Sequence, residues 1–270
     1  MIASAGAARP RTSRLGDAVR GWLPALGVFV GFLVVWEGVV RAFQIKQFIL
    51  PSPVAIAIAW QEYLPELVPA ARHTFVEIIV GLAIGCIAGL IAGGATARYA
   101  AVRESLLPFA IAANSIPILA FAPIFNNWFG VDNQLSKAMV AAALCFFPVM
   151  INTVRGLTSV SPEVVELMRS YAAPDREVFR KVRIPTALPF IFTALRLATT
   201  LATIGAIIAE YFAAPRSSLG QYIATHSSFL QFERSWSAIV FATAIGIGLY
   251  LLVVLAERLV MPWQAQRQHM

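Results

Sequence analysis

The chain is built from long apolar stretches separated by short polar segments, and not from a residue-by-residue alternation of the two. Each apolar stretch has about 20 residues or more, which a helix needs to cross a hydrocarbon core of about 30 Å. The pattern predicts an all-α integral membrane protein with six transmembrane helices. The expected spans are residues 22–43, 74–96, 105–129, 135–157, 186–212 and 237–261.

Composition and charge support a membrane protein. The chain is 59% hydrophobic and only 13% charged, whereas soluble domains are about 25% charged. The net charge of +7 does not require a nucleic-acid partner, because basic residues of membrane proteins collect on cytoplasmic loops. With the N-terminus inside, fourteen basic residues lie on inner segments and six on outer ones. A multi-pass protein with both termini in the cytoplasm is therefore expected.

The N-terminal region resembles the start of a signal peptide, because four arginines precede the first apolar stretch. That stretch continues to about Val40, which is too long for a typical signal-peptide core, and no A-x-A-like cleavage site follows. We predict an uncleaved first span after a disordered, basic, cytoplasmic segment at residues 1–20. Residues 21–65 are expected to hold this span and a short helix, at about 54–64, on the outer surface.

One long charged segment, residues 161–189, interrupts the apolar pattern and is expected to lie in water between the fourth and fifth spans. It opens with Ser161-Pro162-Glu163, which supplies an N-cap, a proline at the first helical position and an early carboxylate. Apolar residues then recur at i, i+3, i+4 and i+7. These are Val164, Leu167, Met168 and Tyr171. The segment predicts an amphipathic helix with an apolar face that docks on a partner.

The third span is unusually polar and contains Pro117 and Pro123. Proline leaves backbone carbonyls without partners, which is tolerated where they meet protein or a water-filled cavity. Two interpretations stay open. The span is either a kinked helix that lines a translocation pathway with Asn114, Pro117 and Asn126, or an ordinary kink satisfied by helix packing.

Polar side chains also gather on one side of the fifth span, within an arc of about 120°. They are Thr193, Arg196, Thr199, Thr200, Thr203 and Glu210. Charged residues in a span are costly unless they face the bundle interior or water, so we assign Thr193, Arg196, Thr200, Thr203 and Glu210 to a translocation pathway. The alternative is that the threonines bond to their own helix and Arg196 extends to water at the inner end.

Other polar and small residues mainly predict structure. Glu37 and Glu77 each lie about one turn from an arginine, Arg41 and Arg72, and interfacial ion pairs are expected, with proton carriage as the alternative role. Glycines recur at four-residue spacing on the second span, which is typical of close helix contact. They are Gly81, Gly85, Gly89, Gly93 and Gly94.

Familiar catalytic and metal-binding motifs do not occur. The sequence has no G-x-x-x-x-G-K phosphate loop and no paired-cysteine or H-E-x-x-H motif. Cys86 and Cys145 lie apart in apolar stretches, and the three histidines are widely spaced. We expect no catalytic residue, no metal site and no cofactor in this chain. Energy for any transport must come from another subunit or from an ion gradient.

Taken in order, these features resemble the membrane subunits of bacterial ATP-binding-cassette importers, and more narrowly the nitrate/sulfonate/taurine-type permeases. The resemblance extends from Leu50-Pro51-Ser52-Pro53 to the last helix. It is most specific in the charged segment, where the family carries E-A-A-x-x-x-G and then an I-x-L-P-like ending. Here these positions read Glu166 to Ala172, followed by Ile184-Pro185 and Leu188-Pro189. Leu167 and Met168 replace the two alanines, and Ala172 replaces the glycine.

The resemblance implies a type I importer permease fold whose cytoplasmic coupling helices, between spans four and five, fit a groove on a separate ATPase subunit. The coupling residues would be Glu163, Glu166, Leu167, Met168, Arg169, Tyr171, Ala172, Arg176 and Arg180. ATP and magnesium would bind to that ATPase. The resemblance further implies a second permease subunit, identical or different, a periplasmic or lipid-anchored solute-binding protein, and surrounding lipid. The permease core is expected at residues 66–262 and a cytoplasmic tail at 263–270.

We therefore expect a subunit of an ATP-driven importer in the bacterial plasma (inner) membrane that passes a small polar solute by alternating access. The alternative is a secondary transporter driven by an ion gradient, which needs buried carboxylates near the midplane and usually inverted repeats. Only Glu210 fits that role, and no repeat is found. Asn126-Asn127 and nearby aromatics resemble permeases for riboflavin-like or pyrimidine-like compounds, and nitrate, sulfonates and taurine stay open.

Overall fold

The computed structural model describes residues 13–212 and 217–263, and all regular structure in these ranges is helical. The helices are α1 Ser13–Ala42, α2 Pro53–Glu62, α3 Leu64–Arg98, α4 Ala100–Ala113, η1 Ile118–Phe121, α5 Ala122–Phe129, α6 Gln134–Thr158, α7 Pro162–Ser170, α8 Asp175–Val178, η2 Phe179–Arg183, α9 Ile184–Phe212, α10 Leu219–Ser228 and α11 Phe232–Val260. Helix α1 already begins at Ser13. The rest of the predicted N-terminal segment, 1–12, and the predicted tail beyond 263 lie outside the described residues.

Five helical segments are long and apolar enough to cross a membrane. They are Leu23–Ala42, Leu64–Arg98, Gln134–Thr158, Asp175–Phe212 and Phe232–Val260. These segments correspond to the predicted first, second, fourth, fifth and sixth spans, although the predicted first span extends one residue further at both ends and the predicted last span one residue further at its C-terminal end. The second begins at Leu64, earlier than the predicted residue 74, so α3 has 35 residues.

The stretch predicted as the third span is divided into separate helices. Helix α4 ends at Ala113, and a turn leads through Pro117 to η1 and α5. Pro117 has no amide hydrogen to donate, and its ring disfavours helical geometry at the residue before it. The helix therefore stops here instead of bending gently.

Helices α3, α6 and α9 form the centre of the bundle through small residues. Four glycines of α3 face the backbone of α6, and a Cβ atom at Gly85 would lie 2.5 Å from the carbonyl oxygen of Ala142. The predicted close-contact face is confirmed for Gly81, Gly85, Gly89 and Gly93. Gly94 does not belong to it, because a Cβ there would meet open space. Cys86 and Cys145 are free and buried.

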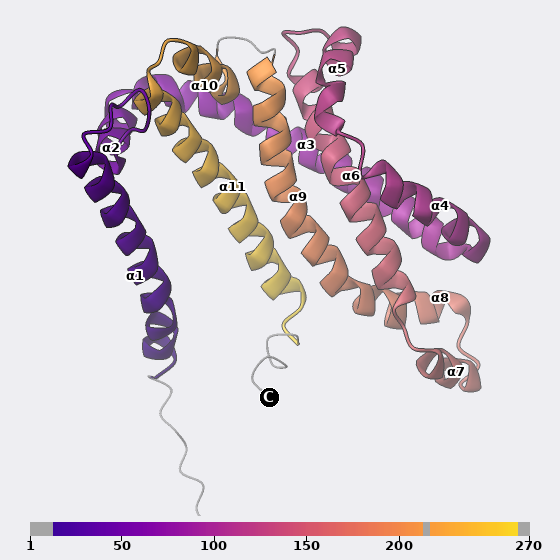
Figure 1. The fold of residues 1–270 in the computed structure, drawn as a ribbon. Helices are drawn as coiled ribbons and strands as arrows, with labels where there is room; N and C mark the ends of the chain where they lie inside the picture. The colour runs from indigo at the N-terminus through magenta and orange to yellow at the C-terminus, as the bar shows by residue number, and fades with distance from the viewer. Residues whose placement is uncertain (1–12, 213–216, 264–270) are drawn as a thin grey trace, which may run out of the picture.

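Figure 1 shows α2, α5 and α10 at one end of the bundle and α7 and α8 at the opposite end. We call these the α10 end and the α7 end. Helix α1 stands to one side, and its Trp36 ring packs on the Trp236 ring of α11 with centroids 5.4 Å apart. Helix α2 starts directly after the Leu50-Pro51-Ser52 turn, because Ser52 caps it by accepting a hydrogen bond from the Ala55 amide.

Candidate functional sites

Helices α7 and α8 project from the bundle at the α7 end (Figure 1). Helix α7 starts at Pro162, where the Ser-Pro-Glu pattern predicts it, and none of its residues is buried. The Glu163 carboxylate accepts hydrogen bonds from the Glu163 amide and from the Ser161 hydroxyl, and these bonds lower the pKa of Glu163. Leu167 and Tyr171 are 54% and 76% exposed. The apolar stripe of α7 therefore has no cover within the described part of the chain.

The predicted coupling residues lie together on this projection. None of the nine is buried. The turn between α7 and α8 is made by Ala172, whose φ of 54° is left-handed. The amides of Ala172 and Ala173 donate to the carbonyls of Arg169 and Met168 at 2.8 and 3.1 Å. This is the Schellman arrangement that usually carries glycine at the left-handed position.

A basic hollow of about 810 Å³ lies between the end of α3 and the α7–η2 segment. Four arginines and one aspartate contribute its charge. They are Arg98, Arg169, Arg176, Arg183 and Asp175. Nearby, Lys181 forms an ion pair with Glu177 one turn away. The hollow and the exposed stripe together offer a positively charged, partly apolar surface that suits an acidic protein partner.

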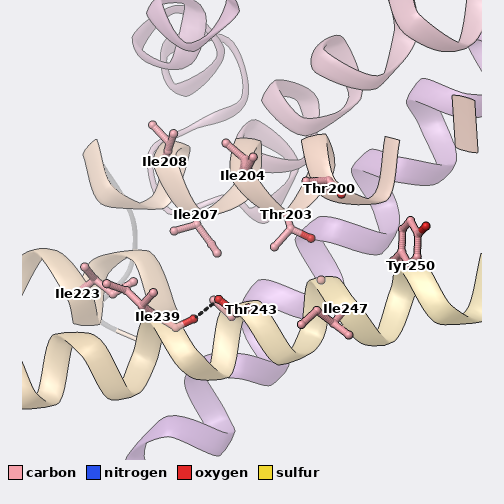
Figure 2. A pocket seen from close by; sticks show the side chains of 12 residues that line it. Thr200, Thr203, Ile204, Ile207, Ile208, Ile223, Ile239, Thr243, Ile247 and Tyr250 are labelled. Carbon is pink, nitrogen blue, oxygen red and sulfur yellow. Dashed lines mark hydrogen bonds between the residues drawn. The ribbon is translucent and has the colours of Figure 1, made fainter. Parts of the chain in front are cut away.

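A second hollow, of about 460 Å³, opens between α9 and α11. Figure 2 shows Thr203 and Ile207 projecting from α9 toward α11, with Tyr250 at one end. The lining is apolar except for hydroxyl groups from Thr200, Thr203, Thr243 and Tyr250. The hollow can therefore hold an uncharged group with a few hydrogen-bonding atoms.

Two of the predicted pathway residues line this hollow, and two others lie near one another on the same helix. Thr200 and Thr203 are in its wall. Arg196 places its Nε atom 3.5 Å from the Glu257 carboxylate of α11, and its guanidinium donates to the Thr193 hydroxyl at 3.2 Å. Thr203 donates to the carbonyl of its own helix at 2.9 Å, as the alternative interpretation expects.

Glu210 lies away from the hollow, in a fully buried cluster at the α10 end. Its Oε1 accepts a 2.7 Å hydrogen bond from the Thr74 hydroxyl, and its Oε2 accepts a 2.8 Å bond from the Gly220 amide. Thr74 in turn accepts from the Leu219 amide at 3.0 Å. A carboxylate at the start of a helix is favoured by the helix dipole. Glu210 therefore fixes α10 against α3 and α9.

Glu77 belongs to the same buried cluster, and sequence reasoning missed it. The predicted ion pair between Glu77 and Arg72 is wrong, because Glu77 is fully buried whereas Arg72 is exposed. The Nδ1 atom of His73 lies 3.4 Å from Glu77 instead. The other predicted ion pair is confirmed, because Nε of Arg41 lies 2.6 Å from Oε1 of Glu37.

The polar residues of the divided stretch do not converge on either hollow. Asn114 ends α4 and is exposed, as is Pro117. Asn126 is buried within α5. Asn114 and Pro117 lie at the break between α4 and α5, and none of the three residues lines the α9–α11 hollow.

Comparison with known proteins gives consistent matches over most of the chain. Residues 81–266 match the model of the family described as "Binding-protein-dependent transport system inner membrane component". The chain is 33% identical over 249 residues to the riboflavin transport system permease protein of Chloroflexus aurantiacus, covering 90% of this chain and 91% of that one. It is 30% identical over 246 residues to the formylaminopyrimidine transport permease protein of Halalkalibacterium halodurans, covering 88% and 95%. It is 26% identical over 259 residues to the taurine transport system permease protein of Escherichia coli, covering 90% of each.

Proposed function

The chain belongs to the family of binding-protein-dependent transport system inner membrane components, and we propose that it passes a small polar solute across the membrane by alternating access. It is a multi-pass transport permease subunit of the inner membrane, of the ATP-binding-cassette importer class, and not an enzyme. Membership in the family implies two partners, an ATPase and a solute-binding protein. ATP and magnesium would then bind to the ATPase.

We infer that α7 and α8 are the coupling helices that dock on the ATPase. The observation that carries this proposal is the apolar stripe of α7, which is exposed on a charged helix that projects from the bundle. Exposed apolar patches with a charged rim are typical of protein interfaces. The basic hollow beside the stripe adds charge for an acidic surface.

We further propose six spans with both termini in the cytoplasm. The divided α4–α5 stretch would make the remaining crossing, in contact with protein and not with lipid alone. The start of α1 and the end of α11 both lie toward the α7 end (Figure 1). Two ends on the same side of the membrane require an even number of crossings, which supports six spans over five. The excess of basic residues on this side supports a cytoplasmic location.

The α9–α11 hollow is proposed as part of the solute pathway, completed by a second permease subunit. Its lining is apolar with hydroxyl groups and contains no basic side chain. Arg196 lies beside it but forms an ion pair with Glu257. Such a wall suits an uncharged heteroaromatic solute better than nitrate or a sulfonate. The named solutes of two relatives, riboflavin and formylaminopyrimidine, have rings of this kind.

Uptake by the complete importer in proteoliposomes tests these proposals. With ATPase and binding protein present, we expect uptake of riboflavin or formylaminopyrimidine that needs ATP on the α7 side and persists without any ion gradient. Taurine or nitrate uptake in their place would overturn the solute class only. Gradient-driven uptake by the permease alone, without an ATPase, would overturn the importer mechanism.

A further inference from the structure

Glu77 is fully buried in α3, yet neither of its carboxylate oxygens has a hydrogen-bond partner among the described residues. The Nδ1 atom of His73, one turn earlier, also lacks one. A buried carboxylate without partners costs several kcal/mol, and buried charges are normally paired or bound to metal. A bound cation would satisfy all of these buried atoms at once.

Three possible ligands converge at this point. One ring nitrogen of His73 and one carboxylate oxygen each from Glu77 and Glu210 all lie within 4.8 Å of one another. His73 and Glu77 share one face of α3 at i, i+4 spacing, and Glu210 comes from α9. Metal–ligand bonds of about 2.0–2.2 Å require these atoms to be near neighbours, so small side-chain rotations would close a site.

The charge of the cluster also favours a cation. Two carboxylates meet here, and the ammonium group of the nearby buried Lys137 of α6 donates a hydrogen bond to the carbonyl oxygen of Val131. Among the described residues, Lys137 forms no ion pair with either carboxylate. Its charge lowers the affinity for a cation but does not occupy the ligand atoms.

We propose that His73, Glu77 and Glu210 bind one divalent transition-metal cation of the zinc or manganese class. Imidazole together with carboxylate ligands suits these metals. Glu210 is already oriented by the Thr74 hydroxyl and the Gly220 amide, which is how outer-shell groups hold metal ligands. The bound ion would join α3 to α9 at the α10 end. This inference does not depend on the solute or on ATPase coupling.

Zinc binding by the purified importer complex tests the site. After equilibration with Zn²⁺ and gel filtration, elemental analysis should find about one zinc per permease chain, and zinc should raise the thermal midpoint. Glu77→Gln and His73→Gln should each weaken zinc binding at least tenfold and abolish the thermal shift. His73→Gln also covers the case in which Glu77→Gln fails to fold, because His73 is only partly buried.

Two matched variants serve as controls. His226→Gln and Glu104→Gln remove the same chemical groups outside the cluster, and they should retain zinc. The assignment is overturned if the folded complex keeps neither zinc nor manganese, or if both cluster variants bind zinc as the natural chain does. A protonated-carboxyl infrared band that disappears in Glu77→Gln, without bound metal, would also overturn it and show a shared proton instead.

Discussion

The Gly220 amide donates a 2.8 Å hydrogen bond to the Glu210 carboxylate and thereby fixes the start of α10 on the end of α9. The approach is so close that a Cβ atom at Gly220 would lie 2.4 Å from the carbonyl oxygen of Ile207 and 2.5 Å from Cβ of Glu210. The first of these atoms belongs to the backbone and cannot rotate away. Glycine is therefore required here by space and not by its backbone angles.

Gly220→Ala should accordingly destabilise the protein by about 1–3 kcal/mol, because an added methyl group forces the packed backbone apart. Thermal unfolding in detergent would show a lowered midpoint, by about 2–4 °C for each kcal/mol. Gly94→Ala is the matched control, since its Cβ meets open space and alanine favours a helix. An unchanged midpoint in Gly220→Ala would contradict the close contact.

Ala172→Gly should stabilise the turn after α7, because the left-handed φ of 54° costs a residue with Cβ about 1 kcal/mol. Amide hydrogen exchange should slow at the end of α7. Ala173→Gly is the control next to it, since Ala173 has no positive φ, and it should give no protection. Faster exchange in Ala172→Gly would mean that the left-handed turn does not persist.

The elements set by local chemistry could be predicted from the sequence. The five long apolar helices follow from composition, and the start of α7 follows from Ser161-Pro162-Glu163. The glycine face of α3 follows from its spacing, because only small residues permit that approach. The location of the proposed docking segment in water could also be predicted from the sequence, because lipid excludes so many charges.

The relations that depend on tertiary packing could not be predicted. Glu210 shares a helical arc with Thr203, but Glu210 accepts a hydrogen bond from the start of α10 whereas Thr203 lines the hollow. Glu77 and Glu210 lie far apart in the chain, so neither residue indicated the other. The i, i+4 spacing of His73 and Glu77 was the one local signal, and alone it is too common to indicate a cluster.

Glu166→Lys should detach the ATPase while leaving the permease inserted, because it replaces the one carboxylate that occupies the glutamate position of the E-A-A-x-x-x-G pattern on the exposed docking helix and does not touch the core. We expect at least a tenfold loss of ATPase in co-purification, together with loss of ATP-dependent uptake. Glu62→Lys places the same reversal at the opposite end of the bundle, and its ATPase should co-purify normally. Full ATPase recovery with Glu166→Lys would remove α7 from the interface.

The ion pair between Arg196 and Glu257 joins α9 to α11 beside the hollow, with its Nε–Oε2 atoms 3.5 Å apart. Arg196→Ala would leave Glu257 half-buried without its partner, which is costlier than losing an exposed pair. We expect about a tenfold change in uptake with normal ATPase association, because the pair lies in the membrane region and not on α7. Arg258→Ala removes an exposed arginine next to Glu257 and should leave uptake unchanged.

A double-mutant cycle separates the pair from the individual charges. If the pair acts as a unit, Glu257→Ala should have an effect similar to that of Arg196→Ala, and the double variant should be little worse than either. Strict additivity of the two effects would show that Arg196 and Glu257 act separately. In that case Arg196 would influence uptake through its own position in the pathway and not by holding α9 against α11.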